Sequence, residues 1–421
     1  IILIKFMKKY LDSNNIIFSL SNMNQLVFEV TDACNLKCKY CAYGEMYEDY
    51  DLREEKILPV GKAIRLIDYL VDFWNSKKNV SINQRVYISF YGGEPLLNMA
   101  FIKEIVDYIE NKLQCPNLRF EFSMTTNALL LHKYMDYLHE HSFFLLVSLD
   151  GNKENTAYRV DKSGKSSFDR IIGNVDRLKE KYPDYFKERV NFNAVLHKKN
   201  SVEEIYLFFK TKYDKIPSIG ELNNVGIRKE MREVFNDTYK NSNESLHQAE
   251  NYEEIERDMF ISTGSYRSVT LFLHKYSGFV FKDYTDLLFV PKEQKSLPTG
   301  TCIPFSKKMY VTVNGKILPC ERIGHQFAFG EITDTEVKLD LEEIAYRYNV
   351  YLAKFDKQCR QCKINESCIQ CMFNIADLGG KPVCHGYVNE ELYRKYVNSQ
   401  MSFLEKNPES YKRIMEEVIV V

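Results

Sequence analysis

Residues 34–41 read Cys-Asn-Leu-Lys-Cys-Lys-Tyr-Cys, which places three cysteines at the spacing C-x3-C-x2-C with Tyr40 directly before the last. Gaps this short let three thiolates from one loop converge on a single metal centre. Cysteine thiolates are the usual ligands of a four-iron cluster, and three ligands leave one iron with an open position. A zinc knuckle or three clustered buried cysteines are the alternatives. No histidine or fourth cysteine lies nearby in the sequence to close a tetrahedral zinc site.

The motif resembles the signature of the radical S-adenosylmethionine (SAM) enzymes, C-x3-C-x-aromatic-C. The resemblance implies that Cys34, Cys38 and Cys41 hold a [4Fe-4S] cluster whose open iron chelates the amino and carboxylate groups of SAM. It also implies that the reduced cluster cleaves SAM to a 5′-deoxyadenosyl radical. Tyr40 matches the family's aromatic position near the adenine.

Strands and helices alternate in the predicted structure around this loop. Apolar residues recur with a period of two in the predicted strands and at helical spacing in the segments between them. Such alternation indicates βαβ units and a parallel sheet. The sequence and the resemblance together predict an α/β protein with a partial (β/α)6 barrel of the TIM type. The predicted strands are 25–31, 85–91, 118–124, 143–149 and 190–196, and the predicted helices are 63–74, 99–113, 131–140, 167–181 and 202–213.

Each predicted strand ends in small or polar residues, and in a parallel barrel these ends share the face that carries the active site. Gly92, Gly93 and Glu94 match the family's GGE motif, which meets the amino group of SAM. Glycine suits this position because it lets backbone come close to a ligand. A simple glycine turn at a strand end is the alternative.

Further SAM contacts follow from the same resemblance. Ser148 matches a serine that binds the SAM carboxylate, and Arg159 lies near the position of an arginine that clamps the same group with its forked donors. The family's usual His-Asp pair before this arginine is replaced here by Asn155-Thr156. The remaining candidates at the barrel mouth are Thr125, Asn127 and Asn193.

Seven of the eleven cysteines lie in the last third of the chain, at 302, 320, 359, 362, 368, 371 and 384. Their spacing suits iron clusters and zinc sites equally well. Asn314-Gly315 between two apolar runs predicts a β-hairpin turn within this region.

The cysteine pattern resembles the SPASM domain of peptide-modifying radical SAM enzymes, which holds two auxiliary [4Fe-4S] clusters and brings the implied total to three. The chain departs from it by having two residues, not three, between Cys368 and Cys371, and by lacking an extra cysteine before Cys302. The nearer cluster would then have only three cysteine ligands, and its remaining iron would bind either a substrate thiolate or amide or a non-cysteine side chain of the protein. The resemblance assigns Cys302, Cys320 and Cys371 to the nearer cluster, and Cys359, Cys362, Cys368 and Cys384 to the farther one.

Glu321 directly follows Cys320, where anaerobic sulfatase-maturing enzymes have an acid that acts as a base. A carboxylate with a suitable pKa can take a substrate proton. A surface carboxylate at a strand end is the alternative.

Composition bounds the protein class. The chain has 421 residues, a formal net charge of −1 and 45% apolar residues, as an ordinary globular protein does. Neither a basic surface for nucleic acid nor a membrane span is indicated. With no signal peptide visible, we expect a cytoplasmic protein whose cysteines bind metal. The chain does not begin with Met, and a leader-recognition domain before Ile1 stays an open question.

The leading hypothesis is a radical SAM oxidoreductase that abstracts hydrogen from a ribosomally synthesised precursor peptide and forms a thioether or carbon–carbon link. Auxiliary clusters would accept the electron, and ferredoxin or flavodoxin would supply the cleavage electron. Sulfatase maturation to formylglycine is an alternative; epimerisation would need a hydrogen donor, for which only Cys115 is spare. A zinc-binding interaction protein and a simple electron carrier are the alternatives from other classes. The expected domains are an N-terminal extension (1–24), a barrel (25–215), a helical bridging region (216–300), the SPASM domain (301–386) and a C-terminal helix (387–421).

Overall fold

The computed structural model describes residues 9–80, 84–115, 118–260, 263–277 and 297–417. Its contacts divide the chain into two units. The larger unit consists of residues 13–252 and 303–344, and the smaller unit takes the described parts of 1–12, 253–302 and 345–421.

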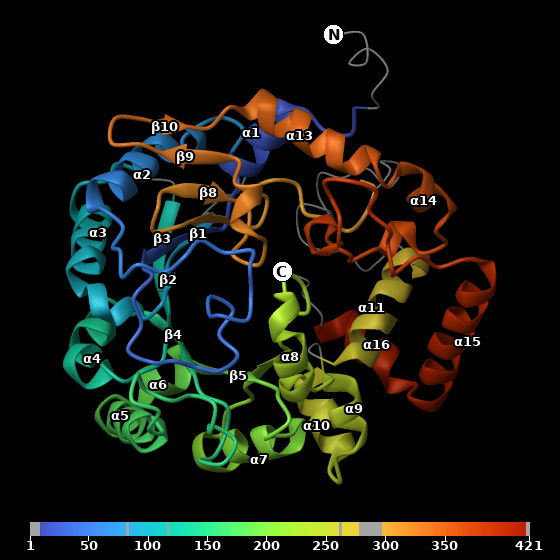
Figure 1. Cartoon of the computed structure of the whole chain (residues 1–421). Coiled ribbons are helices and arrows are strands. Elements are labelled where there is room, and N and C mark those ends of the chain that lie inside the picture. The colour runs from blue at the N-terminus through green and yellow to red at the C-terminus, as the bar shows by residue number, and fades with distance from the viewer. Residues whose placement is uncertain (1–8, 81–83, 116–117, 261–262, 278–296, 418–421) are drawn as a thin grey trace. The chain divides into compact units, whose positions relative to one another are not determined.

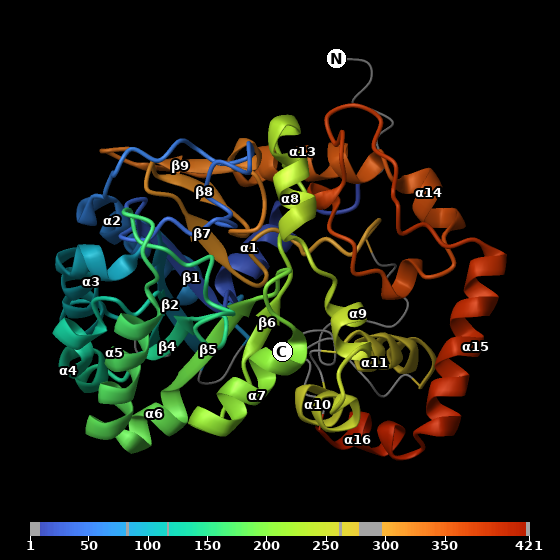
Figure 2. The ribbon, with the colours of Figure 1, turned by 60° about the horizontal axis from the view of Figure 1, so that its bottom comes forward.

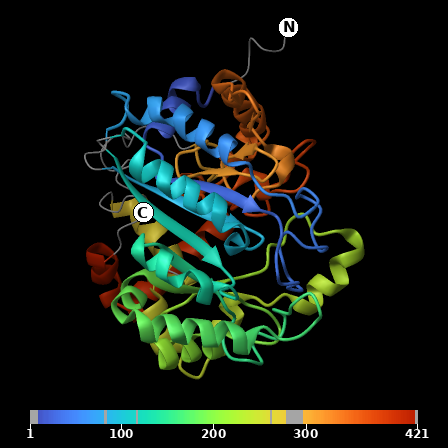
Figure 3. The same cartoon turned by 90° about the vertical axis from the view of Figure 1, so that its left-hand side faces the viewer.

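The larger unit repeats a strand followed by a helix, as the sequence predicts. Figure 1 shows the helices α2, α3, α4, α5 and α7 in an arc outside the strands, and Figure 3 shows the same arrangement from the side. The repeat consists of β1 (Gln25–Thr31), α2 (Val60–Trp74), β2 (Gln84–Gly92), α3 (Met99–Asn111), β3 (Leu118–Thr126), α4 (Leu131–Glu140), β4 (Phe144–Ser148), α5 (Phe168–Lys181), β5 (Val190–Val195), α7 (Val202–Tyr213) and β6 (Ser218–Gly220).

The strands β1 to β6 pair in sequence order, and all of these pairs are parallel. Their carboxyl ends therefore lie along one edge of the sheet, which confirms the predicted partial barrel and brings its strand-end motifs together. Apolar side chains between sheet and helices form the core: the fully buried rings of Phe28 and Phe101 lie 6.0 Å apart. Burial of a side chain of this size stabilises the fold by about 1.5–3 kcal/mol.

The sheet continues past β1 into the cysteine-rich part of the chain. β7 (Met309–Val311) pairs parallel to β1, and β8 (Lys316–Leu318), β9 (Gly330–Ile332) and β10 (Val337–Lys338) follow as antiparallel neighbours. Figure 2 shows β7, β8 and β9 beside β1. The predicted hairpin is confirmed, and Gly315 in its turn has a φ of 83°, which favours glycine. The hairpin places Cys320 directly after a strand of the barrel sheet.

Two helix predictions need correction. The charged run 229–259, which the sequence predicts to be helical, is not one helix but a 3-10 turn (Lys229–Met231) followed by α8 (Arg232–Thr238), α9 (Ser242–His247) and α10 (Tyr252–Met259). Asn241 interrupts the run because its side chain accepts a hydrogen bond from the amide of Glu244 and so starts a new helix. The C-terminal helix is likewise two helices, α15 (Glu390–Lys406) and α16 (Glu409–Glu417), separated by Asn407-Pro408.

Further elements had no clear periodic signal: α1 (Ser13–Ser21), α6 (Pro183–Arg189), α11 (Gly264–Ser277), α13 (Leu341–Ala353) and α14 (Asp356–Gln361). The smaller unit has its own core, where Phe260, Val269 and Ile414 are buried together with neighbouring apolar residues. Part of the predicted bridging region, residues 261–262 and 278–296, lies outside the described residues, as does the end of the predicted C-terminal helix. Within the described part of the chain, no helix has both the length and the apolar character of a membrane span.

Candidate active site at the carboxyl edge of the sheet

The cysteine loop begins directly after β1. Cys34, Cys38 and Cys41 are all partly exposed, and no described cysteine is in a disulfide. The pKa of Cys38 is raised to about 12, mainly by burial and in part by the charges of Cys41 and Cys34, so the three thiols lie close enough to influence one another. No group of three or more His, Cys, Asp or Glu side chains in the described ranges is arranged around a single metal ion. A cluster needs no such arrangement, because each thiolate binds a different iron.

The GGE turn packs against the backbone that leads into this loop. The amide of Gly93 donates to the carbonyl of Thr31 (2.8 Å), and the amide of Glu94 donates to the carbonyl of Ala33 (2.9 Å). A Cβ on Gly92 would lie 2.2 Å from the oxygen of Thr31, and one on Gly93 would lie 2.0 Å from that of Ala33. Both glycines are therefore required by close backbone approach within the protein itself.

Glu94 joins the GGE turn to the end of β3. Its fully buried carboxylate accepts hydrogen bonds from the hydroxyl of Thr126 (2.7 Å), the amide of Asn127 (2.7 Å) and the amide of Leu96 (3.1 Å). Burial raises the pKa of Glu94 to about 7, although these hydrogen bonds lower it. The side chain of Asn127 contacts the cysteine loop, with its Nδ2 2.7 Å from Asn35 Oδ1 and 3.8 Å from Cys34 Sγ.

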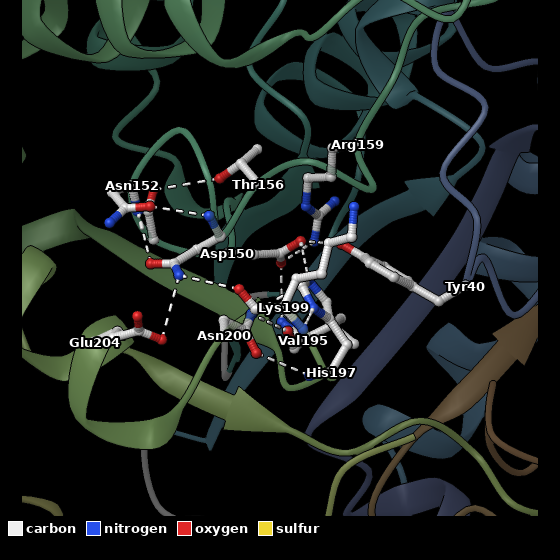
Figure 4. Close-up of polar contacts among 12 residues, drawn as sticks. Tyr40, Asp150, Asn152, Thr156, Arg159, Val195, His197, Lys199, Asn200 and Glu204 are labelled. Carbon is white, nitrogen blue, oxygen red and sulfur yellow. Dashed lines mark hydrogen bonds and ion pairs between the residues drawn. The ribbon is translucent and has the colours of Figure 1, made fainter. Parts of the chain in front are cut away.

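A buried carboxylate at the end of β4 organises the opposite side of the loop (Figure 4). Asp150 Oδ1 accepts hydrogen bonds from Arg159 Nη2 (3.0 Å) and from the amide of Val195 (3.0 Å), and Oδ2 accepts one from the hydroxyl of Tyr40. His197 Nε2 lies 3.8 Å from the same carboxylate. Burial alone would raise the pKa of Asp150, but the charge of Arg159 and these hydrogen bonds outweigh burial and hold it below its usual value.

Tyr40 and Arg159 are therefore neighbours. The ring of Tyr40 is buried, stacks on His197 at 5.6 Å and lies 5.5 Å from the Arg159 guanidinium. Arg159 is only 6% exposed, and its Nε has no hydrogen-bond partner among the residues that the structure describes. An unpartnered buried donor beside the cysteine loop fits an anionic ligand such as the carboxylate of SAM.

Ser148 is the last residue of β4 and is paired in register with Asn193, which lies within β5, two residues before its end. Sequence reasoning did not select Asp150 and His197 as site residues. Both follow a predicted strand end by one or two positions, which is the signal that could have found them.

Cys320 and Glu321 follow β8, a strand of the same sheet that contains β1. Cys320 Sγ is 3.6 Å from Glu321 Oε2, and Glu321 Oε1 is 3.2 Å from Lys308 Nζ. Burial would raise the pKa of Glu321, but Lys308 and Arg322 bring it below its usual value. Glu321 is thus a paired, mostly buried carboxylate and not a free surface group.

A cluster of tyrosines lies between the cysteine loop and this carboxylate. The ring of Tyr43 is 5.0 Å from that of Tyr50 and 6.3 Å from that of Tyr91. Burial raises the pKa of Tyr91, and the charges of Glu321 and Cys41 both raise it further. Tyr91 is therefore close to both groups.

The remaining predicted ligands belong to the smaller unit. The pKa of Cys359 is raised to about 11, mainly by burial and in part by the charges of Cys368, Cys384 and Cys362, so the four cysteines assigned to the farther cluster are neighbours. Cys371 is likewise close enough to Cys302 for its charge to raise the Cys371 pKa, which burial raises most. Cys320, the third predicted ligand of the nearer cluster, belongs to the larger unit.

Comparison with known proteins agrees with this geometry. Residues 28–211 match the model of the Radical SAM superfamily. The chain is 29% identical over 196 residues to a cysteine-type anaerobic sulfatase-maturating enzyme of Clostridium novyi (strain NT), which is 45% of this chain and 49% of that protein. The match thus spans about half the length of this relative. An enzyme of the same name from Clostridium perfringens (strain ATCC 13124) is 22% identical over 81% of this chain and 86% of its own length.

The fold also resembles a solved structure described as native anSMEcpe with bound AdoMet and Kp18Cys peptide. The TM-score is 0.60 at 18% identity, and the alignment covers 93% of this chain and 98% of that one. At this identity the likeness concerns the fold. Together with the superfamily match and the clustered thiols at the carboxyl edge of the sheet, it leads to one conclusion: residues 28–211 form a radical SAM domain.

Proposed function

We propose that the chain is a radical SAM enzyme that removes a hydrogen atom from a residue of a ribosomally synthesised peptide and oxidises it to a thioether or carbon–carbon link. One observation carries the proposal. Cys34, Cys38 and Cys41 lie at the carboxyl edge of the parallel strands beside a buried arginine that has a free donor, and Tyr91 lies near both Cys41 and the cysteine–carboxylate pair of Cys320 and Glu321.

In this proposal the three loop cysteines hold a [4Fe-4S] cluster, which when bound supplies the electron that cleaves SAM. Arg159 binds the SAM carboxylate through its free Nε–H, and Ser148 provides a further contact from the end of β4. Tyr40 presents its ring near the adenine. Further polar contacts at the barrel mouth come from Gly92, Gly93, Glu94, Asn127 and Asn193.

The seven later cysteines hold two auxiliary [4Fe-4S] clusters that receive the electron from the substrate. Proximity of Cys359 to Cys362, Cys368 and Cys384 supports the farther of these sites. Glu321 acts as the base that takes the substrate proton, and its ion pair with Lys308 keeps it ionised for that task. A precursor peptide and an electron donor such as ferredoxin or flavodoxin are the partners.

Sulfatase maturation, the conversion of a cysteine in a protein to formylglycine, is a second candidate. The names of the two Clostridium relatives favour it, as does the carboxylate beside Cys320, which the resemblance assigns to a base in such enzymes. Both reactions begin with hydrogen abstraction and end with the loss of electrons. They differ in the group that traps the oxidised carbon.

The first experiment asks whether the chemistry exists. Protein purified without oxygen should be brown, contain iron and sulfide, and release 5′-deoxyadenosine from SAM with dithionite. The variant with Cys34, Cys38 and Cys41 all changed to alanine should lose this release yet keep the iron of the auxiliary sites. A colourless, zinc-loaded wild type would refute the proposal in favour of a binding protein.

The second experiment asks which product forms. A cysteine-containing precursor peptide, or the Kp18Cys peptide of the similar solved structure, is incubated with enzyme, SAM and dithionite and then weighed by mass spectrometry. Loss of two hydrogen masses with resistance to thiol alkylation indicates a thioether. Exchange of the thiol for an aldehyde oxygen indicates sulfatase-type maturation.

A further inference from the structure

The side-chain amide of Asn127 has a defined orientation. Its Oδ1 accepts a hydrogen bond from the amide of Leu129 (3.0 Å), so its Nδ2 must face away from that segment. Nδ2 is 2.7 Å from Asn35 Oδ1 and 3.8 Å from Cys34 Sγ, and these are its two hydrogen-bond acceptors. The side chain is buried, with the residue 6% exposed. Both amide hydrogens of Asn127 are therefore directed at the cysteine loop.

The backbone of Asn127 is also held in place. Its amide donates to the buried Glu94 carboxylate at 2.7 Å, and the next residue, Ala128, has a φ of 60°. The side chain of Asn174 on α5 donates to the carbonyls of Ala128 (2.9 Å) and Leu129 (3.0 Å). Asn127 thus reaches Cys34 from a turn that three separate contacts fix.

Cys34 receives a second donor within its own loop. The amide of Leu36 lies 3.4 Å from Cys34 Sγ. Only a proline substitution would remove a backbone donor of this kind, and it would also constrain the loop, whereas a side-chain substitution removes the Asn127 donor. Asn127 therefore gives experimental access to the hydrogen bonding of this sulfur.

We propose that Asn127 raises the reduction potential of the cluster bound at Cys34, an inference that rests on the proposed function. Reduction adds negative charge that the ligand sulfurs share, so an N–H···S hydrogen bond stabilises the reduced state more than the oxidised state. Loss of the donor lowers the potential. Asn127 is a tuning residue in this role, in addition to its place at the barrel mouth.

The test compares substitutions that separate the two ends of the amide. Asn127→Asp keeps an acceptor for the Leu129 amide but replaces both donors by a charged oxygen that faces Asn35 Oδ1 and Cys34. Asn127→Ser removes both amide hydrogens without adding charge or bulk, and its hydroxyl is held on a shorter side chain. Asn174→Ala is the matched control, because it weakens the support of the same turn without touching a sulfur.

The measurement is a redox titration of the full-length protein followed by electron paramagnetic resonance. The signal of the loop cluster is identified as the one missing from the Cys34, Cys38 and Cys41 triple-alanine variant. We expect a lower midpoint potential for Asn127→Ser, a larger decrease for Asn127→Asp, and no change for Asn174→Ala. A tenfold loss in the reduction constant would appear as a shift of about 59 mV.

Unchanged potentials in both Asn127 variants would overturn the inference while leaving the proposed function intact. Equal shifts in Asn174→Ala and Asn127→Ser would also overturn it, because turn support and not the N–H···S bond would then be responsible. Loss of the cluster from both Asn127 variants would assign the residue to loop support instead of tuning. A wild type without an iron cluster would refute the proposed function itself.

Discussion

Replacement of Asp150 by alanine tests whether the buried carboxylate holds the two sides of the candidate site together. The substitution removes the acceptor of three hydrogen bonds, from Tyr40, Arg159 and Val195, and leaves the guanidinium of Arg159 without its counter-ion. The side chain of Asp150 is fully buried and that of Arg159 is 7% exposed, so water does not replace the lost partner.

The expected cost follows from this burial. Removal of one partner from a buried ion pair destabilises a protein by about 3–5 kcal/mol. For a unit of this size each kcal/mol lowers the melting temperature by roughly 2 °C, so we expect a decrease of about 6–10 °C. Asp150→Asn keeps an acceptor for Val195 and Arg159 but loses the charge, and it should fall between the wild type and Asp150→Ala.

The matched control is an ion pair of similar length at the surface. Arg170 Nη2 lies 2.9 Å from Asp161 Oδ2, but its side chain is 56% exposed. Arg170→Ala should therefore cost less than about 1 kcal/mol. Calorimetry measures the melting temperatures. Hydrogen exchange of the peptide that contains Val195 adds a local readout, because its amide loses its acceptor only in Asp150→Ala.

A melting temperature for Asp150→Ala within about 2 °C of that for Arg170→Ala would contradict the reasoning. So would unchanged exchange at Val195. Either result would mean that the Asp150–Arg159 pair does not stabilise this part of the barrel.

Three further outcomes are expected. Gly93→Ala should have a lower melting temperature than the wild type and bind less iron, because its Cβ would lie 2.0 Å from the Ala33 carbonyl oxygen. The control Gly173→Ala on α5, which has open space around its Cβ, should raise the free energy of unfolding by up to about 1 kcal/mol. Equal melting temperatures and iron contents of the two variants would refute the packing argument. Burial raises the pKa of Glu29 to about 7, so its ionisation destabilises the fold increasingly as pH rises above the usual carboxyl pKa and most above about 7. Near pH 8, Glu29→Gln should therefore have a higher free energy of unfolding than the wild type, by at most about 3 kcal/mol, whereas near pH 4 the two should be equal. Urea unfolding measures both values. A difference between variant and wild type that does not change with pH would contradict this. Tyr40→Phe should weaken SAM binding measured by calorimetric titration, since the ring stays but its bond to Asp150 is lost; wild-type affinity would show that the bond does not position the ring.

Much of the barrel was predictable because its signals are local. The strand and helix periods of residues 25–213 arise from which face of each element is buried, and the structure confirms the five predicted strands and their helices. The helices after residue 229 were harder, since short charged helices have a weak periodicity and a single capping asparagine can divide them. The sixth strand has only three residues, too few for a pattern.

The candidate site, too, was predictable only where its residues are close in the sequence. Its cysteine ligands could be proposed from spacing, because thiols a few residues apart in one loop must lie close together. The partners of that loop could not: Tyr40 meets Asp150 across 110 positions, and Asn127 meets Cys34 across 93. Asp150 and Asn127 follow different strands, and only parallel pairing brings those strand ends to one edge.

By itself, therefore, the sequence determined the cysteine loop and the strand–helix repeat, since each depends on neighbours along the chain. Tertiary structure alone decided that β7 pairs with β1, that Arg159 is neutralised by Asp150 and keeps a free donor, and that Asn127 is directed at a cysteine sulfur. These features depend on sheet order and burial, which bring together groups that no local pattern connects.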